Sequence, residues 1–96
     1  MIAKRRNGTF LVVDMKLAQA HGIVLAGLLA ELSYLSRITK KDDHGYFRKD
    51  SKYIYEILGL SKMSFMRYRN KLQELGLIDF IPGKNQNEKC RYKVML

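Results

Sequence analysis

The chain has 96 residues, of which 47% are hydrophobic and 28% charged, which suits one globular domain with its own core. Its longest apolar run, 23–30, is far shorter than the roughly 20 residues that a membrane-spanning helix needs, and its one cysteine, Cys90, excludes an intrachain disulfide. The formal net charge of +9, from 18 Lys and Arg against 9 Asp and Glu, favours a polyanionic partner.

The N-terminal part is predicted to contain one short strand and two helices. Residues 9–13 (TFLVV) are β-branched and aromatic, which is typical of a strand. Asp14 can cap a short helical turn over 15–20, which should break near Gly22. Residues 23–38 carry apolar side chains at spacings of three and four and predict a long helix. Its first half is apolar on nearly all sides, so we expect a buried central helix or, in part, a dimer seam.

The middle of the chain predicts a strand followed by a helix. A polar connection over 39–45 leads to a short strand at 46–47. Asp50 or Ser51 should cap the next helix, which is expected to run to about Leu58.

A second helix is predicted to follow after a tight turn. Gly59 suits a left-handed stop, after which Leu60 can return to the core. Ser61 can cap the second helix, and Gly76 can end it. These signals together predict a helix-turn-helix over 50–76.

The C-terminal part predicts a β-hairpin. Strands are expected at 77–81 and 89–95, with a polar turn or loop over 82–88 that contains Pro82 and Gly83. The second strand alternates, with one face consisting of Cys90, Tyr92 and Val94 and the other of Lys89, Arg91 and Lys93. The apolar row should face the core.

The second helix divides into a packing face and an exposed face. At about 100° per residue, the packing face consists of Phe65, Tyr68, Leu72 and Leu75. The exposed face consists of Met63, Met66, Arg67 and Asn70, flanked by Lys62 and Arg69 on one side and by Ser64 and Lys71 on the other. Arg and Asn can each make bidentate contacts to base edges, and a methionine can contact a thymine methyl. A helix N-terminus commonly grips phosphate.

A solvated helix face would also be rich in Lys and Arg, so the second helix alone supports DNA binding weakly. The hairpin changes the balance, because residues 61–96 hold eight basic side chains against three acidic ones. Two exposed methionines are also unusual for a solvated face and could instead form a small protein-contact patch.

Residues 45–96 resemble a winged helix-turn-helix domain. The matching pieces are the GYF strand, the LGLS turn, the KLQELGLI helix end and the returning RYKV strand. With the segments VVDMKLA and IVLAGLLAELSYLSR, the whole chain resembles the N-terminal domain of plasmid and phage replication initiators, which bind repeated origin sites, often as dimers. The chain departs from that family at Tyr55, where a small residue is common, and at Met63 and Ser64, where basic residues or threonine are common.

The resemblance implies an α+β, mainly α fold over 1–96 as a single winged-helix domain, with a long buried N-terminal helix and a small antiparallel β wing over 77–95. It places the groove-inserting part at 61–70 and the wing tip at 84–89. The candidate DNA-binding residues are Ser61, Lys62, Met63, Ser64, Met66, Arg67, Asn70, Lys71, Lys84, Lys89 and Arg91. The sequence ends with the wing, so we expect either a free-standing binder or part of a longer initiator.

We therefore expect binding to double-stranded DNA in plasmid or phage replication initiation or its control. A homodimer and replication proteins are further candidate partners. One alternative is a transcriptional regulator of a mobile element, and another is a protein-interaction module that uses Met63, Met66 or the central helix. Binding of single-stranded nucleic acid through tyrosine stacking is a third alternative.

The sequence offers no set of residues for catalysis, metal binding or a cofactor. His21 and His44 lack the spaced Cys and His partners of a zinc site, and no glycine-rich phosphate loop occurs. Cys90 alternates inward on its strand, which favours a buried structural thiol. We expect a protein that is not an enzyme and needs no cofactor. The lone thiol and the lack of a signal-peptide pattern predict a cytoplasmic protein without a membrane partner.

Overall fold

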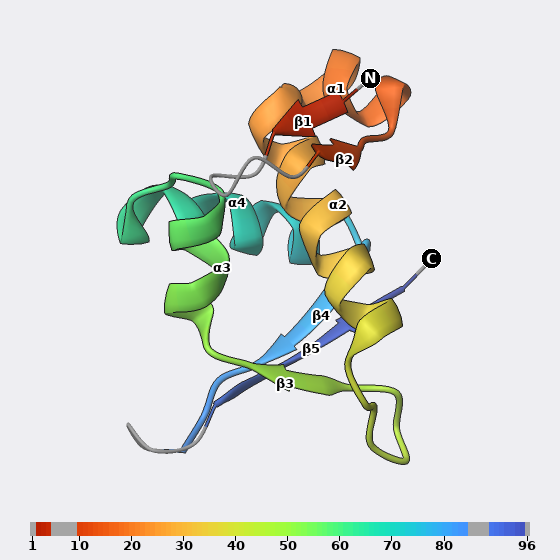
Figure 1. Cartoon of the computed structure of the whole chain (residues 1–96), viewed down its shortest axis with the longest axis vertical. Helices are drawn as coiled ribbons and strands as arrows, with labels where there is room; N and C mark the ends of the chain where they lie inside the picture. The colour runs from red at the N-terminus through yellow and green to blue at the C-terminus, as the bar shows by residue number, and fades with distance from the viewer. Residues whose placement is uncertain (1, 5–9, 85–88, 96) are drawn as a thin grey trace.

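The computed structural model describes residues 2–4, 10–84 and 89–95. Within these ranges the chain forms four helices and two small antiparallel sheets, an α+β, mainly α arrangement of the winged-helix-like kind (Figure 1). The elements in chain order are β1 (Ile2–Lys4), β2 (Phe10–Val12), α1 (Met15–His21), α2 (Ile23–Ile38), β3 (Phe47–Lys49), α3 (Ser51–Ile57), α4 (Lys62–Glu74), β4 (Ile78–Ile81) and β5 (Cys90–Val94). The predicted fold class is confirmed.

The predicted signals at the start of α1 and α2 are confirmed. The Asp14 carboxylate accepts a hydrogen bond from the Leu17 amide at 2.8 Å and so caps α1. Gly22, at φ 95°, separates α1 from α2, because this backbone conformation interrupts a helix and is rarely adopted by other residues. Helix α2 has the predicted bounds. Strand β1 was not predicted, since three residues of a basic stretch become a strand only by pairing with β2.

Helix α2 forms the centre of the molecule, as predicted. Its buried residues include Leu28 and Leu32, which pack with residues of α3, α4 and the sheet in one continuous core. The first turn is the exception to the expected burial, because Ile23 and Val24 are exposed. Glu31, which the sequence pattern did not single out, is fully buried on this helix.

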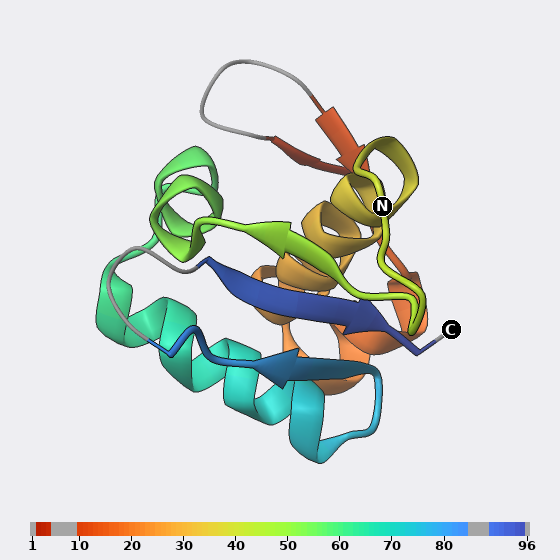
Figure 2. The same cartoon turned by 90° about the horizontal axis from the view of Figure 1, so that it is seen from below.

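The second sheet has strand order β3-β5-β4, so the last strand of the chain lies between the other two. Tyr92 of β5 is opposite Phe47 on one side and Phe80 on the other. The ring centroids are 5.8 Å and 5.3 Å from that of Tyr92, which is fully buried. The helices lie behind this sheet in Figure 2. The predicted inward row of β5 is confirmed, because Cys90 and Val94 also pack against the core.

The turn between α3 and α4 has the predicted chemistry. Asp50 caps α3 by accepting from the Lys52 amide at 3.0 Å, and Gly59 adopts φ 71° after the helix ends. The Leu60 amide donates to the Tyr55 carbonyl at 2.8 Å, and the Leu60 side chain packs against the core. The Ser61 hydroxyl accepts from the Ser64 amide at 3.1 Å and caps α4.

The packing face of α4 was predicted correctly except at its end. Phe65 and Leu72 are buried, and Tyr68 is half-buried against the core. Leu75 was expected on this face but is 37% exposed. It is the residue that follows the last helical position, Glu74, and Gly76 at φ 75° then redirects the chain. The Leu75 backbone is still right-handed helical and its amide donates to the Lys71 carbonyl at 3.0 Å, so the side chain keeps the predicted direction but lies where the core no longer covers this face.

Candidate nucleic-acid interface

The structure brings most of the predicted α4 residues onto one exposed surface. The outward side chains are Lys62, Met63, Met66, Arg67 and Asn70. Met63 is 77% exposed, far more than a core methionine would be. Ser61 is the helix cap and Ser64 donates its amide to that cap, so both lie at the N-terminal end of α4. We call the stripe of Met63, Met66, Arg67 and Asn70 the α4 outer stripe.

Arg69 was expected to flank the α4 outer stripe as an exposed cation, and this expectation is wrong. Its guanidinium carbon lies 3.9 Å from the centre of the Phe80 ring on β4 and 5.6 Å from that of Phe65. The side chain is half-buried and lies between α4 and β4. A stacked guanidinium of this kind positions the two elements relative to each other.

Arg69 also holds the side chain of its neighbour. Its Nε and Nη2 atoms donate to the Asn70 Oδ1 atom at 3.3 Å and 3.1 Å. A bidentate contact from Asn70 to adenine uses both the amide oxygen and the amide nitrogen. In this arrangement the nitrogen remains available, while the oxygen is shared with Arg69.

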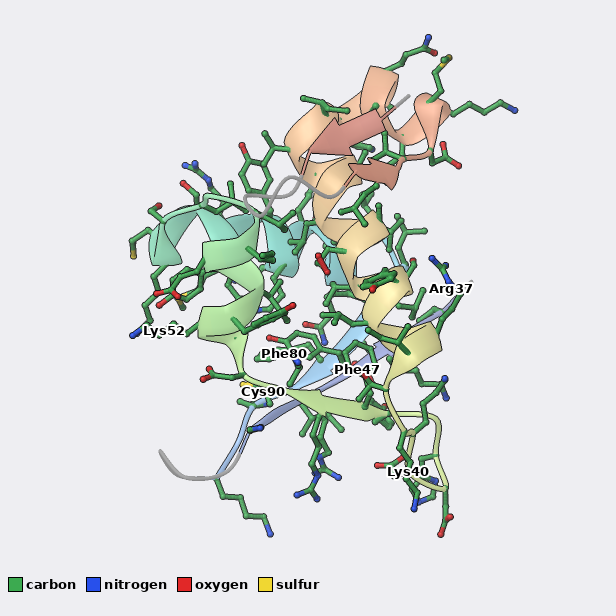
Figure 3. All side chains as sticks on the ribbon, in the orientation of Figure 1. Arg37, Lys40, Phe47, Lys52, Phe80 and Cys90 are labelled. Atoms are coloured by element: carbon green, nitrogen blue, oxygen red, sulfur yellow. The ribbon has the colours of Figure 1, made fainter. Side chains whose placement is uncertain are left out.

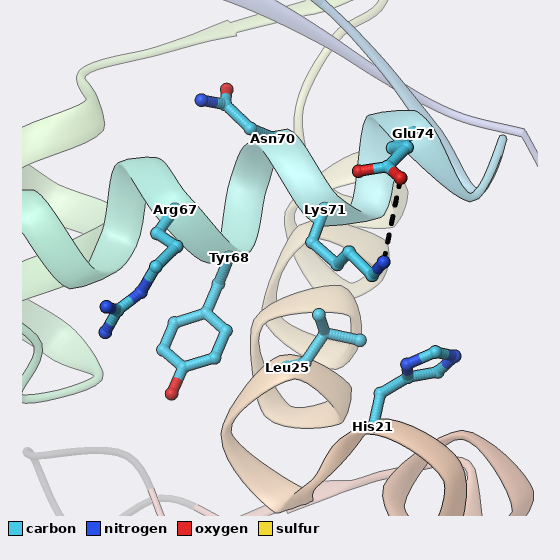
Figure 4. A pocket seen from close by; sticks show the side chains of 7 residues that line it. All are labelled: His21, Leu25, Arg67, Tyr68, Asn70, Lys71 and Glu74. Atoms are coloured by element: carbon cyan, nitrogen blue, oxygen red, sulfur yellow. Dashed lines mark ion pairs between the residues drawn. The ribbon is translucent and has the colours of Figure 1, made fainter.

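Lys71 borders the α4 outer stripe, next to Arg67, on the side of α4 that faces the junction of α1 and α2. Its Nζ atom is 3.7 Å from a Glu74 carboxylate oxygen. Lys71 and Arg67 line one side of an open pocket of about 370 Å³, and His21 lines the other (Figure 4). No sequence pattern signalled this arrangement, because His21 and Lys71 are brought to the same pocket by the packing of α2 against α4.

The wing contributes a basic outer face to the sheet. Lys84 and Lys89, at the two ends of the expected wing tip over 84–89, are exposed, and residues 85–88 lie outside the described residues. Arg91 on β5 is directly opposite Arg48 on β3 in the register. Like charges that face each other across two strands are destabilising, so an anion bound over them would relieve the repulsion. Sequence reasoning missed Arg48, whose place depends on the pairing of β3 with β5.

Three side-chain hydrogen bonds fix the sheet to its surroundings. The Tyr46 hydroxyl donates to the Asp79 carboxylate, which raises the pKa of the Tyr46 phenol. Burial raises the pKa of Tyr92 to about 12, against the effect of its hydrogen bond with the Ser51 hydroxyl. The Tyr46 amide donates to the Asp42 carboxylate at 3.0 Å and so lowers the pKa of that carboxyl. Both phenols therefore stay neutral at physiological pH and act as fixed hydrogen-bonding groups.

Comparison with known proteins identifies the fold. No protein-family model and no curated protein sequence matches the chain. A solved structure described as the N-terminal domain of a DNA binding protein superposes with a TM-score of 0.72 at 16% identity, covering 94% of this chain and 76% of the other. A second, described as the structure of a Rep-DNA complex, has a TM-score of 0.70 at 17% identity, with 94% and 77% covered. At such low identity the likeness shows a shared fold.

None of the described helices is both long and apolar enough to cross a membrane.

Proposed function

We propose that this chain is a non-enzymatic, cytoplasmic module that binds double-stranded DNA, with α4 as a recognition helix in the major groove and the β4–β5 wing on the flanking backbone. The single observation that carries the proposal is the α4 outer stripe. It presents Arg67 and Asn70 to solvent beside two exposed methionines, on a helix anchored to the core by Phe65 and Leu72.

The dimensions and charges of this surface fit duplex DNA. A helix of 13 residues is about 20 Å long, and the major groove, at about 12 Å wide, accepts an α-helix. Lys62 at the start of α4 and the basic side chains of the wing can neutralise phosphates on either side of the groove. The exposed methionines could make apolar contacts with a thymine methyl, and these contacts would remove apolar surface from water.

The solved structures of the same fold suggest the biological process in which this chain would bind DNA. One is described as the N-terminal domain of a DNA binding protein, and the other as a Rep-DNA complex. Together with the resemblance of the sequence to plasmid and phage replication initiators, these descriptions support a role in replication initiation or its control. Regulation of transcription in a mobile element uses the same surface and is the second candidate process. A homodimer would bind paired half-sites.

The experiment that tests the assigned roles is a set of fluorescence anisotropy titrations with two duplexes, one selected from a random pool and one scrambled. Arg67→Ala and Asn70→Ala should each reduce the preference for the selected duplex by about 1–3 kcal/mol. Lys89→Ala and Arg91→Ala should weaken binding to both duplexes alike.

Arg37→Ala is the matched control for Arg67→Ala, because it removes the same charge from an exposed helix position. Arg37 lies in the last turn of α2, far from α3 (Figure 3). If Arg37→Ala weakens binding as much as Arg67→Ala, or if neither does, α4 is not the recognition helix. If substitution of Met63 abolishes capture of a protein partner at high salt while duplex binding stays unaffected, the protein-interaction alternative holds instead.

A further inference from the structure

The pocket between α4 and the junction of α1 and α2 is a second feature of the α4 surface. Arg67, Lys71 and Glu74 line it from α4, His21 lines it from the end of α1, and Leu25 contributes from α2 (Figure 4). Its volume is about 370 Å³, and it is open to solvent. Neither the helix-groove contact nor the wing contact accounts for it.

The donors around this pocket suit an anion. Arg67 and Lys71 are four residues apart and therefore lie on the same side of α4, with the Tyr68 ring between them (Figure 4). The His21 imidazole lies across the pocket and can donate a hydrogen bond in either protonation state. A phosphodiester has two non-bridging oxygens, which can accept hydrogen bonds from both walls of the pocket at once.

Among the described residues that line the pocket, Glu74 is the acidic one, and it forms an ion pair with Lys71. Its carboxylate lies 3.7 Å from the Lys71 ammonium, and the side chains of Lys71 and Glu74 are 43% and 72% exposed. Exposed ion pairs of this kind contribute little to stability, so Lys71 can exchange its partner at small cost. Glu74 should therefore oppose an anion in the pocket without excluding it.

The position of the pocket beside the α4 outer stripe suggests a DNA phosphate as the anion. Arg67 and Asn70 belong both to the α4 outer stripe and to the pocket lining. A helix inserted in the major groove has a sugar-phosphate backbone along each side. We propose that the pocket seats one backbone phosphate of the DNA bound by α4, held by Lys71 and His21, so that the α1–α2 junction forms part of the interface. This inference rests on the proposed function.

The first test compares the two histidines of the chain by anisotropy on the selected duplex. His21→Ala should weaken binding about threefold to tenfold, and Lys71→Ala should lower the log–log salt slope by about 0.9, the value for one phosphate contact. His44→Ala is the control, because His44 is exposed in the 39–45 connection, where its backbone amide donates to the Asp42 carboxylate. Equal affinity of His21→Ala and His44→Ala would overturn the inference.

The second test removes the negative charge of Glu74 from the pocket. Glu74→Gln should tighten binding severalfold, because Lys71 is released and repulsion of the phosphate is lost. Glu56→Gln is the matched control, since Glu56 forms a similar exposed pair with Lys52 on α3 at 3.9 Å. If both substitutions tighten binding equally, the effect is general electrostatics and the pocket has no particular role.

A scan of the duplex with single uncharged methylphosphonate linkages locates the contact. One linkage should weaken binding of the wild-type protein, and His21→Ala should lose little further affinity at that linkage, because both changes remove the same interaction. If the losses add at every linkage, His21 contacts no phosphate. A wild-type protein that binds no duplex at low salt would instead overturn the proposed function itself, so the two failures are distinguishable.

Discussion

The Arg69 guanidinium carbon lies over the Phe80 ring, 3.9 Å from the ring centre, and the same guanidinium donates two hydrogen bonds to Asn70. One side chain thus joins the body of α4 to the first strand of the wing and orients an amide on the exposed surface. In the proposed DNA-binding role, Arg69 would therefore couple recognition by α4 to the placement of the β4–β5 hairpin.

Replacing Arg69 with lysine tests this coupling. Arg69→Lys keeps the positive charge but loses the planar stack and the paired donors. We expect the free energy of unfolding to fall by about 0.5–1 kcal/mol, the size of a cation–π contact, and the preference for the selected duplex to fall more than the affinity for a scrambled one. Urea unfolding and anisotropy measure the two effects. Arg37→Lys should change neither quantity, and an equally silent Arg69→Lys would contradict the coupling.

The two leucines near the end of α4 should differ sharply in their contribution to stability. Leu72 is fully buried, so Leu72→Ala should cost about 2–5 kcal/mol. Leu75 is 37% exposed and should cost less than about 1 kcal/mol when changed to alanine. Chemical denaturation of both variants gives the comparison. Similar losses would mean that α4 continues its apolar face through Leu75, as its spacing alone suggests.

The buried Tyr92 should make the fold sensitive to alkali. Its pKa is raised from 10.0 to about 12 by burial, so its contribution to stability is complete below pH 10 and is lost as the pH rises towards 12. The full effect is roughly 2–3 kcal/mol, at 1.36 kcal/mol for each pKa unit. Urea unfolding at about pH 9 and about pH 11.5 should therefore show a smaller drop for Tyr92→Phe than for the wild type.

The wild-type protein, measured at the same two pH values, is the reference for the alkaline drop of Tyr92→Phe. Tyr46, whose pKa is raised by its hydrogen bond to Asp79, should preserve part of the drop in Tyr92→Phe. At neutral pH the Tyr92→Phe variant should lose about 1 kcal/mol from its bond with Ser51. An alkaline drop identical to that of the wild type would show that Tyr92 does not resist ionisation.

The elements that depend on local signals could be predicted from the sequence. Helix α2 and the turn at Gly59 were predicted because helical spacing, caps and left-handed glycines act over a few residues. Strand β1 could not be predicted, since its structure depends on a partner strand. The burial of Glu31 was missed for a similar reason, because it depends on what packs around α2.

The candidate site was predictable only in part for the same physical reason. Helical spacing identified the α4 outer stripe, because the face of a helix follows from its period. The contact of Arg69 with Phe80 on β4 and the position of His21 at the pocket beside α4 depend on tertiary packing, which no local pattern encodes. Lys71 was predicted on the second helix, but its neighbours at the pocket, such as His21, could be identified only from the structure.

The central claim is that α4 and the wing bind duplex DNA, and the salt dependence of binding tests it most directly. Anisotropy titrations of the wild-type protein with a labelled duplex and with its single strand, over a series of salt concentrations, give the affinity of each. We predict tighter binding to the duplex, with a linear log–log fall of about −0.9 for each phosphate neutralised. No duplex binding at low salt, or equal affinity for the single strand, would contradict the claim.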